Sequence, residues 1–228
     1  MEKQVGKCGL FGQAILKVSC GIIIVGLLIF LPAWTVDYWQ GWLLMTVLFV
    51  PMVIAGFVML FKNPELLKKR LNAKEEQKEQ QSVILFSMII FIASFVVAGL
   101  NHRFGWILLP DAVTYVSAAV FLLAYILYAE VLRENMYLSR TVEVQNEQKV
   151  VDTGLYGIVR HPMYMATILL FLSMPLILGS VISFGIMLLY LPIINKRMVN
   201  EEKILSEGLP GYSDYMKKVK YRIFPYIW

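Results

Sequence analysis

Long apolar runs separated by polar stretches dominate the hydropathy pattern of this 228-residue chain. Four runs are long enough to cross about 30 Å of hydrocarbon as helices, and two shorter runs follow, joined only by Gly179-Ser180. In order, the six are Ala14–Ala33, Trp42–Phe61, Val83–Leu100, Ala112–Leu132, Met163–Leu178 and Val181–Ile194. The pattern predicts about five to six transmembrane helices. The last two form a tight C-terminal helical hairpin that either spans the bilayer or enters it partway.

The composition is that of an all-α integral membrane protein. Hydrophobic residues make up 58% of the chain and charged residues 16%, and the mean hydropathy of +0.65 is too high for a soluble globule of this size. The first apolar run continues past Phe30 without a cleavage pattern, so we expect no removed signal peptide. The only cysteines, Cys8 and Cys20, offer neither a disulfide framework nor a metal cluster. We therefore expect no metal.

The distribution of basic residues predicts the orientation. If there are six spans, all but one of the 21 Lys and Arg residues fall on one side, and Arg103 alone lies opposite. This bias explains the net charge of +5 without nucleic acid, and it predicts that both termini and the cofactor site are cytoplasmic. The membrane would be the plasma or inner membrane of a prokaryote, or the endoplasmic reticulum of a eukaryote. Trp34, Trp39, Trp42 and Trp106 lie near the opposite interface, as an aromatic belt would.

Two polar segments are expected to be helical. Lys62–Gln81 is rich in Lys, Glu and Gln and is interpreted as a connector with a solvated face. Pro210–Tyr221 alternates aromatic and basic residues, and a helix would place Tyr212, Tyr215 and Val219 on one face. This second segment is predicted to be a cytoplasmic amphipathic helix on the anionic inner leaflet.

Candidate chemistry stands on both sides of the hairpin. Before it lies Arg160-His161-Pro162-Met163-Tyr164. Proline at the first helical position leaves the other N–H groups of that turn available, and such a helix start can bind a carboxylate or phosphate. The plain alternative is that Arg160 and His161 only mark the cytoplasmic interface.

After the hairpin, Arg197 and Glu201 are four residues apart and share a helical face. A surface ion pair is the simple alternative, although Arg before Glu is the weaker order for such a pair. Glu202 points about 100° away, so it is expected to cap the helix, pair with Lys196 or Lys203, or line the rim. A carboxylate at Glu201 and an anion cradle suit a zwitterion such as the amino-acid end of S-adenosylmethionine, and a lipid head group also fits.

Four motifs in order resemble the C-terminal signature of the isoprenylcysteine carboxyl methyltransferase family, which is itself similar to the phospholipid N-methyltransferases. They are G-L-Y at 154–156, R-H-P-M-Y at 160–164, R-x-x-x-E-E-x-x-L at 197–205 and G-Y-x-x-Y at 211–215. The resemblance covers about Val144–Trp228 and implies an enzyme that uses S-adenosyl-L-methionine. It implies two parts: 1–140 with the N-terminal transmembrane helices and the polar connector, and 141–228 as the catalytic region.

The resemblance also implies roles for single residues. Arg197 matches the position that faces the substrate carboxylate, and Arg197 with Glu201 would be the catalytic pair. The residues implied to bind the cofactor are Gln145, Gln148, Lys149, Val150, Val151, Tyr156, His161, Pro162, Met163, Tyr164 and Glu201.

The methyl acceptor implied by the resemblance is a lipid or a prenylated small molecule or protein that enters from the bilayer. Carboxyl O-methylation of a prenylcysteine-like substrate is the leading hypothesis. The alternatives are phospholipid N-methylation, an NADPH-dependent membrane sterol or enone reductase, and a non-catalytic membrane scaffold or small transporter. The Glu201-Glu202 pair and the short chain favour methyl transfer over reduction.

Overall fold

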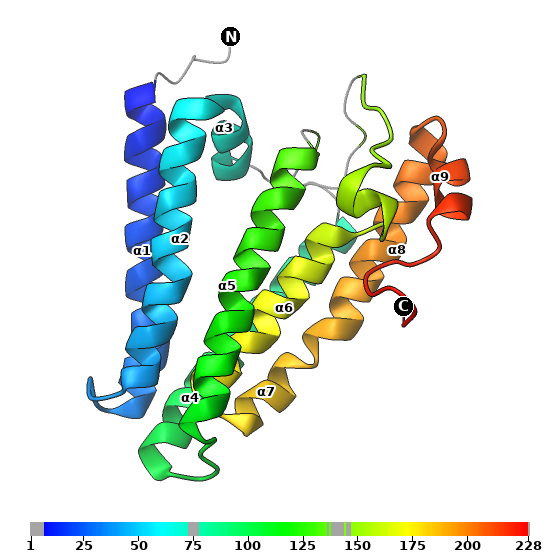
Figure 1. The fold of residues 1–228 in the computed structure, drawn as a ribbon. Coiled ribbons are helices and arrows are strands. Elements are labelled where there is room, and N and C mark those ends of the chain that lie inside the picture. The colour runs from blue at the N-terminus through cyan, green and yellow to red at the C-terminus, as the bar shows by residue number, and fades with distance from the viewer. Residues whose placement is uncertain (1–6, 73–77, 136, 138–143, 145–146, 228) are drawn as a thin grey trace.

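The computed structural model describes residues 7–72, 78–135, 137, 144 and 147–227, and this part of the chain is helical without a sheet (Figure 1). Five helical stretches are long and apolar enough to cross a membrane. They comprise α1 (Lys7–Ala33), α2 (Trp39–Lys62), α4 (Lys78–Phe104), α5 (Asp111–Glu134) and the stretch Val181–Gly208, which contains α7 (Val181–Met187) and α8 (Tyr190–Gly208). The prediction of an all-α multi-pass membrane protein is confirmed.

The predicted hairpin is present, with one short arm and one long arm. Its first arm is α6 (Pro162–Ile177), whose 16 residues extend about 24 Å, less than the roughly 30 Å hydrocarbon layer. The chain reverses at Gly179, which has a φ of +68° that glycine adopts readily. The returning arm was predicted to end at Ile194 but continues to Gly208, because its later polar residues have partners inside the protein.

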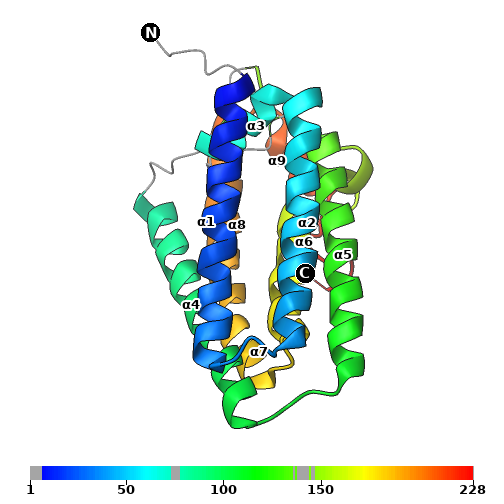
Figure 2. The same cartoon turned by 90° about the vertical axis from the view of Figure 1, so that its left-hand side faces the viewer.

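The helices alternate in direction, so connections gather at two ends of the bundle. The start of α1, the short helix α3 (Pro64–Asn72), the end of α5 and the helix α9 (Tyr212–Lys218) lie at one end. The α1–α2, α4–α5 and α6–α7 connections lie at the other (Figures 1 and 2). At that far end the Arg103 guanidinium lies 5.2 Å from the Trp34 ring.

The apolar faces meet in two main clusters. One joins α1, α2, α4, α5 and α6, with Phe121 and Ile177 fully buried. The other joins α4, α6 and α8 and includes Ile223, from the segment after α9. Between α4 and α7 the buried hydroxyls of Ser94 and Ser183 are 2.7 Å apart. The second cluster therefore ties the C-terminal segment to the hairpin.

The polar connector begins as a helix, as predicted. The Asn63 side chain accepts a hydrogen bond from Leu66 N–H (3.1 Å) and so caps the start of α3. Leu67 is buried against Leu10 of α1 and Leu60 of α2. The described part of the connector thus packs on the bundle through Leu67, with Leu71 packed beside it.

The predicted amphipathic helix forms as α9, but its aromatic face is buried in the protein and is not available to the leaflet. Tyr212, Tyr215 and Val219 are at most 5% exposed and pack against Leu205 and Leu209 of the same molecule. Gly211 precedes the helix with a φ of +86°, which turns the chain back towards α8. The aromatic face of α9 is therefore a wall of the protein.

The arrangement of the two ends predicts the outcome of cysteine labelling. In a chain whose Cys8 and Cys20 are replaced by serine, a single cysteine at Lys217 and one at Arg103 should lie on opposite sides of the membrane. A membrane-impermeant maleimide should label one in intact cells and the other only after permeabilisation. A cysteine at Lys203, which shares its end with Lys217, is the matched control. Labelling of Lys217 and Arg103 from the same side would contradict the arrangement.

Candidate active site

A pocket lies where α5 ends, α6 begins, and α8 leads into α9. It encloses about 820 Å³ of space, including the solvent at its mouth. Its walls come from residues far apart in the sequence: Asn135, Tyr137, Gln148, Lys149, Val150, Val151, Tyr156, Arg160, His161, Met163, Tyr164, Arg197, Glu201, Leu205, Leu209, Tyr212 and Tyr215.

The start of α6 forms one wall. Pro162 occupies the first turn, as predicted, and the first hydrogen bond of the helix runs from Met165 N–H to His161 C=O (3.1 Å). The N–H groups of Met163 and Tyr164 precede that bond, and they belong to the group that a helix leaves without intrahelical partners. This end of α6 therefore brings backbone donors and positive dipole to the pocket.

The helix α8 contributes the Glu201 carboxylate and the Arg197 guanidinium to the pocket wall, and both contact the hydroxyl of Tyr164. The Tyr164 hydroxyl donates to Glu201 Oε2 (2.5 Å), and Arg197 Nε donates to the Tyr164 oxygen (3.1 Å). Arg197 and Glu201 do share a face, as their spacing predicts. Instead of a plain surface pair, they border the pocket on either side of the buried Tyr164.

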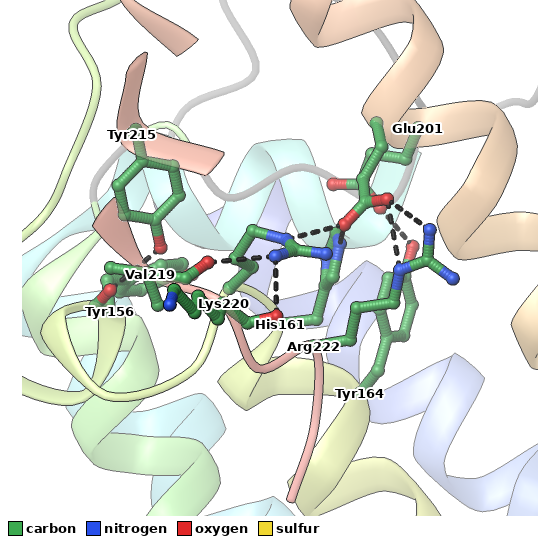
Figure 3. Close-up of polar contacts among 10 residues, drawn as sticks. Tyr156, His161, Tyr164, Glu201, Tyr215, Val219, Lys220 and Arg222 are labelled. Atoms are coloured by element: carbon green, nitrogen blue, oxygen red, sulfur yellow. Dashed lines mark hydrogen bonds and ion pairs between the residues drawn. The ribbon is translucent and has the colours of Figure 1, made fainter. Parts of the chain in front are cut away.

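Glu202 lies beside the pocket, not in its wall, and its predicted partners were wrong. Figure 3 shows its neighbour Glu201 together with His161, Tyr164 and Arg222. Instead of Lys196 or Lys203, the Glu202 carboxylate accepts from Arg160 Nε (2.7 Å) and Arg222 (Nη2, 2.9 Å), and it contacts His161 Nε2 (3.1 Å). Only 7% of Glu202 is exposed. The anion that Arg160 and His161 hold in this structure is thus an internal carboxylate.

A tight turn supports the pocket from the side of α5. Gly154 begins a single 3₁₀ turn, η1 (Gly154–Gly157), with a φ of +53°, and Glu134 accepts a hydrogen bond from Leu155 N–H (2.9 Å). A Cβ on Gly154 would lie 1.7 Å from a Glu134 oxygen, so any other residue would have to displace the Glu134 side chain as well as adopt a positive φ. The turn places Tyr156 in the pocket wall, where its hydroxyl accepts from Asn135 (3.0 Å).

The aromatic wall is fixed by hydrogen bonds of α9. The Tyr215 hydroxyl donates to the Tyr156 carbonyl (2.8 Å), which joins α9 to the 3₁₀ turn. Burial raises the pKa of both Tyr156 and Tyr215 above the usual range of a phenol, so both hydroxyls stay protonated at neutral pH. The ammonium of Lys218 adds an exposed contact to Asp152 (2.8 Å), on the segment that leads into the turn.

The structure gathers most of the predicted site residues around this pocket. Of the set implied to bind the cofactor, Pro162 is absent from the wall and acts as the helix start, and Gln145 lies outside the described residues. Sequence reasoning missed Asn135 and Tyr137, which carry no motif, and Leu209. Leu205, Tyr212 and Tyr215 were part of the quoted motifs but were given no place in the cofactor pocket.

Comparison with known proteins finds a family that part of the chain resembles. Residues 112–209 match the family model of phospholipid methyltransferases, and the stretch includes α5, the 3₁₀ turn, the hairpin and α8. No curated protein matches the chain. Methyltransferases of this family use S-adenosyl-L-methionine. Residues 112–209 are thus similar to phospholipid methyltransferases, and the chain is a membrane methyltransferase that uses S-adenosyl-L-methionine.

The geometry at Gly154 predicts that one added methyl group lowers the thermal stability of the protein. Gly154→Ala should lower the melting temperature of the detergent-solubilised protein, because the positive φ alone costs about 1–2 kcal/mol for an L-residue and the Cβ would displace Glu134. Gly185→Ala is the control, because a Cβ there meets nothing within 4 Å and the residue is helical. An unchanged melting temperature in Gly154→Ala would show that the turn is not needed.

Proposed function

We propose that the pocket holds S-adenosylmethionine with its amino-acid end between Glu201 and the start of α6. The observation that carries the proposal is the pairing of a carboxylate with backbone N–H groups across one pocket. Glu201 suits the ammonium group, and the amides of Met163 and Tyr164 suit the carboxylate. The apolar side chains of Leu205 and Leu209 and the ring of Tyr212 would receive the less polar remainder of the molecule.

We further propose that the acceptor is the carboxylate of a prenylcysteine-like lipid and that Arg197 orients it. A guanidinium has five N–H donors in a rigid fork, and Arg197 borders the pocket. A carboxylate can accept two parallel N–H bonds from such a fork. Because Tyr164 joins Arg197 to Glu201, the acceptor group and the amino-acid end of the cofactor would be held relative to one another by a single side chain.

Positioning and exclusion of water are the chemical tasks of this chain. The bound cofactor supplies a methyl group activated on a sulfonium centre. A carboxylate is already ionised at neutral pH and needs no general base, so Arg197 and Glu201 act by orienting the two reactants. Holding them at attack distance can supply much of the rate enhancement. The buried rings of Tyr156, Tyr212 and Tyr215 keep water from one side of the pocket.

A second candidate is N-methylation of a phospholipid amine, and the family match itself favours it. An amine acceptor must lose a proton before it can attack, so it needs a base or a lowered pKa that a carboxylate does not need. Arg197 would repel the protonated amine. The cofactor site would be the same in both reactions, and the two therefore differ in the chemistry of the product and in the role of Arg197.

The pocket end of the bundle is proposed to face the cytoplasm. The bias of basic residues supports this orientation, since they are enriched in cytoplasmic segments. The water-soluble cofactor would then reach the pocket from the cytoplasm, while the lipid acceptor would enter from the bilayer between helices.

Replacement of Glu201 tests the cofactor site. Glu201→Gln should weaken binding of S-adenosylhomocysteine by about tenfold or more, since a charged hydrogen bond contributes about 1.5–3 kcal/mol. Calorimetry in detergent gives the dissociation constant directly. Glu207→Gln, an exposed carboxylate later on the same helix, should bind as the wild type does. Equal affinity of the folded Glu201→Gln protein and the wild type would remove Glu201 from the site.

Replacement of Arg197 tests the acceptor. With a prenylcysteine-like acid, Arg197→Lys should lose turnover but keep affinity for S-adenosylhomocysteine, because lysine cannot reproduce the two-bond contact with a carboxylate. The radiolabelled product should be a methyl ester that releases volatile methanol in alkali. An alkali-stable product from native membranes, together with full activity of Arg197→Lys, would reject the carboxyl acceptor in favour of the amine.

A further inference from the structure

The segment that follows α9 is bound along its backbone to the residues just before α6. Four consecutive carbonyls, from Val219 to Arg222, accept hydrogen bonds from Arg160 and His161. Arg160 Nη1 donates to the first two (2.8 and 2.9 Å), and the N–H groups of Arg160 and His161 donate to the next two (2.9 and 2.8 Å). The next residue, Ile223, is fully buried between the arms of the hairpin.

The Glu202 carboxylate also links the residues before α6 to the segment that follows α9. One carboxylate oxygen faces Arg160 and His161, and the other accepts from Arg222 Nε (3.1 Å) and Nη2 (2.9 Å). The Glu202 side chain is 8% exposed and that of Arg160 9%. A buried carboxylate with several charged donors is tightly fixed, and loss of one member leaves the others uncompensated.

His161 and Arg160 line the pocket, whereas Glu202 and Arg222 do not. Because an ionised carboxylate can only accept, the contact with Glu202 places a proton on His161 Nε2 and fixes the plane of the ring. The two residues before Pro162 also lack helical partners for their N–H groups, and the C-terminal segment supplies these partners.

We propose that Glu202 is a positioning residue that makes the C-terminal segment, residues 219–223, part of the active site. Through Arg160 and His161 it sets the wall of the pocket, and through Arg222 it makes that wall depend on a segment some 60 residues further along the chain. The expected effect of this segment on cofactor affinity rests on the proposed function. Its expected effect on the orientation and proton position of His161 is independent of that function.

The test uses Arg222, which is outside the pocket wall, and the fact that the chain has only two histidines. In full-length protein labelled with ¹⁵N-histidine, the His161 signals are assigned by their loss in His161→Gln and their retention in His102→Gln. The wild type should show a protonated Nε2. Arg222→Met and Glu202→Gln should shift the His161 signals, and Arg222→Lys should shift them less. Lys217→Met, from an exposed ion pair on α9, should leave them unchanged.

A second readout separates positioning from simple stability. Arg222→Met should weaken binding of S-adenosylhomocysteine by about tenfold, the loss expected when a hydrogen bond to a charged group is removed, with partial rescue in Arg222→Lys. Unchanged His161 signals, or wild-type affinity, in a folded Arg222→Met protein would overturn the proposal even if Glu202→Gln fails to fold. If the wild type itself binds no S-adenosylhomocysteine, the proposed cofactor site fails, and the His161 signals still decide the positioning role.

Discussion

The attraction between the buried Glu202 carboxylate and the guanidinium groups of Arg160 and Arg222 holds together three parts of the chain that are distant in sequence. Two guanidinium groups so close together would repel each other without it. Breaking a buried ion pair by removal of one partner typically costs about 3–5 kcal/mol, because a charge is left uncompensated. The residues before α6, the second half of α8 and the C-terminal segment meet at this carboxylate, and the pocket lies beside it.

The adjacent carboxylates of Glu201 and Glu202 on α8 have different surroundings because helical geometry separates them. Glu201 and Glu202 point in directions about 100° apart, so the first reaches the pocket and the second reaches the protein interior. The Glu201 carboxylate is bound by a neutral phenol, whereas Glu202 is bound by cationic groups.

Local periodicity made much of this architecture predictable. Apolar run length gave the spans and the hairpin, and the four-residue spacing placed Arg197 and Glu201 together. The partners of Glu202 were not predictable in this way, since Arg222 returns to it only because the chain turns at Gly211 and Ile223 enters the hairpin core. The aromatic face of α9 was predicted to contact a membrane because an apolar stripe indicates that a helix face is buried. The stripe does not identify the surface against which the face packs. Asn135 carried no signal, because its contact with Tyr156 depends on how α5 ends.

The shortness of α6 bears on how a lipid substrate is handled. If the turn at Gly179 reaches the far edge of the hydrocarbon layer, an arm of about 24 Å leaves the pocket mouth about 6 Å inside the near edge. Withdrawal of an acyl or prenyl chain into water costs about 0.8 kcal/mol for each methylene exposed. An acceptor that meets its enzyme below the surface keeps those methylenes in hydrocarbon throughout the reaction. The free energy of substrate extraction, which a water-exposed site would have to overcome in every turnover, is thereby largely avoided.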